Sequence, residues 1–164
     1  MTPSERLREL GLTLPPVTAP LAAYVPAVAY GSLVWSSGQL PMVDGKLVMT
    51  GLVTTGLSHD GMVSSEEAAE LARICALNAL AAVASVAGPR GVDGIARIVK
   101  VVGFVASAPG FTGHPGVVDG ASRLLADVFG ESGRSARSAV GVAALPLGAP
   151  VEVEIVAALA EESV

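Results

Sequence analysis

The stretch Ser64–Gly88, SSEEAAELARICALNALAAVASVAG, is the clearest structural signal in the chain. It opens with a capping box, because the Ser64 side chain can accept a hydrogen bond from the Glu67 amide while the Glu67 side chain reaches back. Strong helix formers follow as far as Gly88-Pro89, a pair that stops helices. We therefore predict a long helix over this stretch.

One face of this predicted helix carries mostly small side chains at helical spacing. The residues of that face are Leu71, Ile74, Cys75, Asn78, Ala81, Ala82 and Ser85. A face with such small side chains predicts close packing against a sheet. Cys75 is the single cysteine of the chain, and a lone buried cysteine is expected to pack as a small hydrophobe.

Strands are predicted on both sides of this helix. Upstream, one strand covers Leu33-Val34-Trp35 and ends near Ser36, and a second begins near Lys46 after the hairpin signal Asp44-Gly45. The glycine-rich segment 51–63 is predicted as a loop. Downstream, we expect a central strand over 95–105, a second helix over 117–129 and two further strands over 138–145 and 151–159.

The N-terminal residues carry weaker signals. The charged stretch 5–10 predicts one or two helical turns, and the prolines that follow favour an extended arm. We expect residues 1–20 to form an N-terminal extension and residues 21–164 to form a single domain.

The order of the predicted elements is β-β-α-β-α-β-β, which indicates an α+β fold with two helices covering one face of a mixed sheet. The other face would remain apolar. Hydrophobic residues make up 51% of the chain and charged residues only 15%. Both observations predict that copies of the chain cover this face in a homo-oligomer.

Charge and hydropathy disfavour two classes of partner. The formal net charge is −5 and no basic cluster is visible, so nucleic-acid binding is disfavoured. No run of 18 apolar residues and no signal-peptide pattern is found, so we expect a cytoplasmic protein without a membrane span.

A search for known reactive motifs leaves few candidates. His59 and His114 stand far apart in glycine-rich segments without a second ligand, and we expect both to be exposed loop histidines. We find no phosphate-binding loop, dinucleotide fingerprint or serine-hydrolase elbow. No metal or other cofactor is therefore expected.

The strongest candidate site lies in the two C-terminal strands. Arg137 stands at the mouth of an apolar strand, where a guanidinium needs an acidic partner. Glu152 and Glu154 share one face of the next strand. Two interpretations remain open: an ion pair between Arg137 and a strand glutamate that only ties the strands together, or a guanidinium held ready for a ligand carboxylate beside a proton-handling acid.

Four segments in this order resemble the RidA family, also called the YjgF/YER057c/UK114 or endoribonuclease L-PSP family. They are 23–28 with 35–41, Asn78-Ala79-Leu80, Gly103-Phe104-Val105, and RSAVGVAALP at 137–146 followed by VEVEI at 151–155. The resemblance covers roughly residues 20–160. It implies a chorismate-mutase-like fold, a homotrimer and pockets between subunits, with no cofactor.

The resemblance also implies roles for individual residues. Arg137 would bind a substrate carboxylate and Glu152 would orient the attacking water. Tyr24, Ser37 and Gly38 would line the pocket, together with Ala139, which stands where many relatives have cysteine. Many relatives also carry an asparagine near the start of the second helix, and here Asp119 or Ser122 occupies that region. The chain resembles a longer subgroup, with extra residues at the N-terminus, in segment 51–63 and between Phe104 and Arg137.

The activity implied by the resemblance is hydrolysis of reactive enamines and imines, such as 2-aminoacrylate, to a 2-oxo acid and ammonia. The alternative is a non-catalytic protein that binds small carboxylate metabolites in the same cleft between subunits. Some relatives are called endoribonucleases, but the acidic charge balance of this chain argues against that activity.

Overall fold

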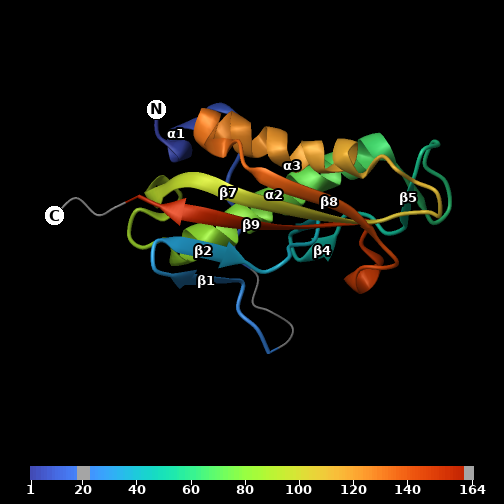
Figure 1. The fold of residues 1–164 in the computed structure, drawn as a ribbon, viewed down its shortest axis with the longest axis horizontal. Helices are drawn as coiled ribbons and strands as arrows, with labels where there is room; N and C mark the ends of the chain where they lie inside the picture. The colour runs from blue at the N-terminus through green and yellow to red at the C-terminus, as the bar shows by residue number, and fades with distance from the viewer. Residues whose placement is uncertain (18–22, 161–164) are drawn as a thin grey trace.

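The computed structural model describes residues 1–17 and 23–160. Its centre is a five-stranded mixed sheet in the order β1-β2-β9-β7-β8 (Figure 1). The strands of this sheet are β1 (Ala27–Tyr30), β2 (Leu33–Ser36), β7 (Ile95–Ala106), β8 (Ala136–Val142) and β9 (Val151–Leu159). β7 and β8 are parallel, and the other neighbouring pairs are antiparallel.

Two long helices cover one face of this sheet, as the sequence predicts. The helix α2 (Ser65–Val86) packs on β9, β1 and β2, whereas α3 (His114–Phe129) packs on α2 and reaches β7 and β8. In Figure 1 the strands lie in front of α2. The fold is therefore the predicted chorismate-mutase-like α+β arrangement.

The predicted capping box starts α2. Ser64 is the N-cap, its side chain accepts from the Glu67 amide, and the Glu67 side chain accepts from the Ser64 amide. Cys75 on this helix is fully buried, and burial, followed by the charge of Glu152, raises the pKa of its thiol. It packs as a small hydrophobe, as predicted.

The helix α2 is long and apolar enough, by length and composition alone, to cross a membrane. Its packing explains this composition. Leu71, Leu80 and Val83 are buried in the same core as residues of β9 and α3. We therefore interpret α2 as the central core helix of the domain.

The first strands of the sheet differ from the prediction. The sheet begins with β1, which was predicted as part of an extended arm and which turns into β2 at Gly31, with φ of 60°. The Asp44-Gly45 hairpin forms, but its strands β3 (Met42–Val43) and β4 (Lys46–Leu47) pair only with each other. The predicted strand start near Lys46 is confirmed by β4, but β4 lies outside the main sheet.

Other helices and strands begin or end at different residues than predicted. Segment 51–63 is not only loop, because β5 (Leu52–Thr54) pairs in parallel with β6 (Met62–Ser64). α3 begins three residues before the predicted start, and β8 covers 136–142 instead of 138–145. The short 3-10 helices 91–94, 130–133 and 146–148 join the larger elements.

The N-terminal helix α1 (Pro3–Glu9) confirms the predicted helical turns. It contacts α3 and the 3-10 helix 91–94, and its Leu7 is buried in the core. Ser4 donates from both its amide and its hydroxyl to the Asp93 carboxylate, at 2.8 and 2.7 Å. These contacts attach α1 to the domain.

The second face of the sheet lies opposite α1, α2 and α3, and it is only partly apolar, because Glu152, Glu154 and Lys100 lie on it as well. Directly paired residues of neighbouring strands share a face. On this open face Val28 pairs with Trp35, Trp35 pairs with Val156, and Val140 pairs with Phe104. Val28, Trp35 and Val140 are exposed in the single chain. Exposed apolar side chains gathered on one sheet face are typical of subunit contacts.

Candidate functional site

Strand register places Arg137 on the helix-covered face of the sheet. Arg137 pairs with Val101, and Val101 pairs with the buried Ile155, without a register shift between them. Ile155 and Val101 belong to the core beneath the helices. The Arg137 side chain therefore points toward α3.

Two side chains of α3 contact the Arg137 guanidinium. Nη1 donates to Asp119 Oδ1 at 2.6 Å and to Ser122 Oγ at 3.2 Å. Both positions that the resemblance left open for the family asparagine thus reach the same arginine. The side chain of Arg137 is 26% exposed, and the side chain of Asp119 is 40% exposed. Of the two interpretations left open for Arg137, the ion pair with a strand glutamate is not formed within the chain, because the acid beside Arg137 comes from α3.

Glu152 lies on the other face of the sheet. It pairs with Phe104, which in turn pairs with the exposed Val140, so all three belong to the open face. The alternation predicted for β9 is confirmed, because Val151 and Val153 are buried while Glu152 is partly exposed. Within one chain, Arg137 and Glu152 are therefore on opposite faces of the sheet.

Gly38 is in direct contact with the Glu152 carboxylate. A β-carbon built at Gly38 would overlap Oε1 of Glu152, so any other residue here would require the Glu152 carboxylate to move from this position. The next residue, Gln39, exchanges two backbone hydrogen bonds with Val153, at 2.8 and 3.0 Å. These bonds hold the segment after β2 against β9, and with it the contact between Gly38 and Glu152.

Hydrogen bonds from Ser37 and Asn78 hold the chain on both sides of Gly38 in place. The Ser37 hydroxyl donates to the Val25 carbonyl oxygen at 2.6 Å, next to Tyr24, which is exposed. On α2, the Asn78 amide donates to the carbonyl oxygens of Leu40 and Met42, at 2.9 and 3.1 Å. Asn78, which was predicted on the packing face and within a segment of the family resemblance, anchors the segment that follows Gly38.

The six predicted site residues thus fall into two groups within one chain. The first, which we call the glutamate group, is Tyr24, Ser37, Gly38 and Glu152. The second, the arginine group, is Arg137 and Ala139, with Asp119 and Ser122 beside Arg137. Ala139 pairs with Gly103 on the helix-covered face, two residues after Arg137. A site that uses both groups requires more than one chain.

His114 is not the exposed loop residue that the sequence predicts. It is the first residue of α3 and is partly buried, with its ring edge-to-face on Phe111 at 5.0 Å between centroids. Its Nε2 lies 3.1 Å from the Ser107 hydroxyl. His59, in contrast, is exposed. No local signal in the sequence connects Ser107 with His114, because the segment between them folds back through Pro109 and Gly110.

Burial raises the pKa of Glu152, and the charge of Glu154 on the same face raises it further. A carboxyl group with a raised pKa can take up a proton closer to neutral pH than an exposed one. This property suits a group that exchanges protons with water.

The raised pKa predicts how stability changes when Glu152 is replaced by glutamine. Because folding disfavours the ionised form, the stability contributed by the protonated Glu152 is complete below the unfolded-state pKa and is lost as the pH rises through the folded-state pKa. The always-neutral Glu152→Gln variant should therefore melt at a higher temperature than the original chain at pH 7. The two proteins should melt alike near pH 3.5.

Thermal unfolding followed between pH 3.5 and pH 8 tests this prediction. Glu70→Gln is the control, because Glu70 is exposed on α2. It should change the melting temperature little at any pH. A Glu152→Gln variant that is less stable at pH 7, or whose difference from the original chain stays constant with pH, would contradict the prediction.

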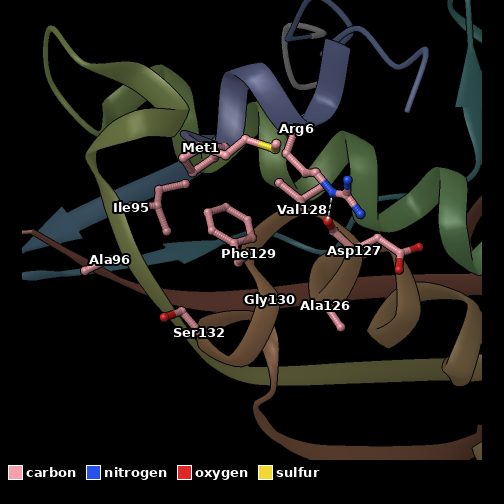
Figure 2. Close-up of a pocket in the computed structure, with 11 residues that line it drawn as sticks. Met1, Arg6, Ile95, Ala96, Ala126, Asp127, Val128, Phe129, Gly130 and Ser132 are labelled. Atoms are coloured by element: carbon pink, nitrogen blue, oxygen red, sulfur yellow. Dashed lines mark hydrogen bonds between the residues drawn. The ribbon is translucent and has the colours of Figure 1, made fainter. Parts of the chain in front are cut away.

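A surface hollow lies at a different place, between α1, the start of β7 and the end of α3 (Figure 2). Its charged side chains are Arg6 and Asp127, and Arg6 Nε donates to the Asp127 carbonyl oxygen at 2.8 Å. None of the predicted site residues lines it. In the described ranges, no group of three or more histidine, cysteine, aspartate or glutamate side chains could hold a metal ion.

The mixed sheet with two helices on one face defines a chorismate-mutase-like α+β domain. Residues 4–159 match the family described as "YjgF/chorismate mutase-like, putative endoribonuclease", and the chain belongs to this family. The protein TCP17 of Trypanosoma cruzi is 43% identical over 149 residues, which are 90% of this chain and 88% of that protein.

Solved structures of similar proteins share the fold of this chain. The protein Atu1372 of Agrobacterium tumefaciens, of unknown function, is 43% identical with a TM-score of 0.83, covering 96% of this chain and 92% of that one. An endoribonuclease-like protein of Shewanella oneidensis is 32% identical with a TM-score of 0.86, covering 97% and 100%. Escherichia coli TdcF with bound serine, at 21% identity and a TM-score of 0.58, covers 86% and 91% and shares the fold.

Proposed function

We propose that this protein hydrolyses reactive enamines and imines of the 2-aminoacrylate type to a 2-oxo acid and ammonia, without a cofactor. The observation that carries the proposal is the state of the Arg137 guanidinium. Only Nη1 is hydrogen-bonded to other described residues, and the side chain is partly exposed. Nε and Nη2 together form one edge of the guanidinium, and that edge can take a ligand carboxylate in a two-pronged hydrogen bond.

The reaction itself needs little beyond orientation and proton transfer. 2-Aminoacrylate converts to its imine tautomer, and water adds to the carbon of the C=N bond while Glu152 takes a proton from the water. The nitrogen gains protons and leaves as ammonia as the C–N bond breaks and the C=O bond forms. One water is consumed for each 2-oxo acid and ammonia released. Arg137 holds the carboxylate throughout.

We propose that the two groups of the site come from neighbouring subunits of a homotrimer in the cytoplasm. Arg137 and Glu152 lie on opposite faces of the sheet in one chain, so a second chain must supply the missing group. The exposed apolar residues Val28, Trp35 and Val140 offer the surface on which subunits would associate. The resemblance to trimeric relatives supports three subunits.

Turnover of 2-aminoacrylate generated in situ by a dehydratase tests the activity. The purified protein should accelerate pyruvate release over the spontaneous rate. If it binds 2-oxobutyrate in calorimetry without accelerating pyruvate release, the protein is a non-catalytic carboxylate binder and the enzymatic proposal fails.

Mixing two inactive variants tests the shared site. Arg137→Ala and Glu152→Gln subunits, unfolded together and refolded in equal amounts, should regain activity. In a ring of three subunits each mixed trimer contains one complete site, so random mixing should restore about one quarter of the original activity.

The two variants refolded separately are the control and should stay inactive. If both groups of a site came from the same chain, mixing would restore nothing. Inactive mixed trimers, verified by mass spectrometry of the intact assembly, would therefore contradict the shared site.

A further inference from the structure

The Asp119 carboxylate lies against Arg137, the residue that we propose binds the carboxylate of the ligand. Its Oδ1 lies 2.6 Å from Arg137 Nη1, and Ser122, one helical turn later, accepts from the same nitrogen at 3.2 Å. Both residues accept from Nη1, and no hydrogen bond from Nε or Nη2 to another described residue competes with a ligand. A ligand carboxylate at the opposite edge of the guanidinium would therefore share the arginine with a second carboxylate.

Because Asp119 lies beside it, Arg137 presents a different net charge to a ligand than a lone arginine would. Arg137 and Asp119 together carry no net charge. Arg123 approaches Asp119 Oδ2 at 3.8 Å, but its side chain is 80% exposed, so water and salt screen most of its contribution. A ligand with only a carboxylate would gain the attraction of Arg137 and meet the repulsion of Asp119.

We propose that Asp119 is a specificity-determining residue, which makes the site prefer ligands with a cationic nitrogen next to the carboxylate over the corresponding 2-oxo acids. An iminium or ammonium group beside the carboxylate would offset the charge of Asp119. The Asp119 side chain is 40% exposed and can face such a ligand.

This inference rests on the proposed function and adds a consequence to it. The substrate imine carries the nitrogen, which is cationic when protonated, whereas the 2-oxo acid product has lost it. Asp119 would therefore hold the protonated substrate more tightly than the product. Loss of ammonia removes the cation, and the repulsion between Asp119 and the product carboxylate then favours release of the product.

Calorimetric titration with 2-aminobutyrate and 2-oxobutyrate, which share one carbon skeleton, tests the preference. The original protein should bind the amino acid more tightly. In Asp119→Asn the ratio of the two dissociation constants should shift toward the oxo acid by about tenfold. Asparagine keeps an oxygen for Arg137 Nη1, and Asp119→Ser is a second neutral variant that should shift the ratio in the same direction.

Asp127→Asn is the matched control, because it removes one negative charge from an exposed position of the same helix. It should leave the ratio unchanged. If both ligands bind in a manner that requires Arg137 but neither Asp119 variant shifts the ratio, this inference is overturned and the proposed carboxylate site stands. If binding of neither ligand depends on Arg137, both are overturned.

Discussion

Replacing Arg137 with alanine is expected to lower kcat/KM for 2-aminoacrylate hydrolysis by about 10²- to 10³-fold, because the variant loses a two-pronged, charge-assisted grip on the substrate carboxylate. Arg137→Lys should recover only part of the loss, since an ammonium group is a single point of contact without the planar fork. Pyruvate release from 2-aminoacrylate generated in situ measures the rates.

Arg134→Ala is the matched control for this loss. Arg134 precedes Arg137 by three residues, its side chain is 74% exposed, and its ion pair with Glu131 at 3.3 Å lies in solvent. Its removal should change kcat/KM little. Circular dichroism should show that Arg137→Ala remains folded, because Asp119, its lost partner, is open to water. An Arg137→Ala variant with the original rate would remove the basis of the proposed mechanism.

The local signals of the sequence predicted the parts of the fold that depend on local contacts. The capping box of Ser64 and Glu67 places the start of α2, because both partners lie within one turn. The Asp44-Gly45 turn also forms, with φ of 50° and 75° at its two residues. The alternation of side chains along a strand put Glu152 on the other face of β9 from Val151 and Val153. This alternation could be predicted because it depends only on the pleat of the strand.

Contacts between distant segments were harder to predict. β1 has only four residues and follows a proline-rich arm, so its pairing with β2 has no strong local signal. The length of the strands around Asp44-Gly45 is likewise set by what surrounds the hairpin. In these regions tertiary pairing determines the structure: the sequence patterns placed β2 and the start of β4, but they missed β1 as the partner of β2.

In the candidate site, too, local features could be predicted from the sequence and contacts between distant segments could not. The sequence singled out Arg137 and Glu152 by residue type and resemblance, but it did not show that they lie on opposite faces. That relation depends on the register of β8 against β7 and of β7 against β9. Asp119 was named as a candidate for the family asparagine, but its contact with Arg137 was not predicted, because that contact depends on the packing of α3 on the sheet.

Replacing Gly120 with alanine is expected to destabilise the protein severely. Gly120 lies inside α3, where alanine normally stabilises a helix by up to about 1 kcal/mol. Here a β-carbon would overlap the backbone carbonyl oxygen of Ala69 on α2, so the two helix backbones would have to separate. We expect a loss of about 3 kcal/mol or more, which lowers the melting temperature of a domain of this size by roughly 6–12 °C.

Gly116→Ala separates this overlap from the general effect of alanine in α3. Gly116 is exposed on the same helix, and a β-carbon there would meet nothing within 4 Å. Its replacement should leave stability unchanged or raise it slightly. Equal melting temperatures for the two variants would contradict the close approach of α2 and α3. Because Asp119 precedes Gly120, separating the helices should also weaken its contact with Arg137, so the folded fraction of Gly120→Ala should lose the preference for amino acid ligands as well.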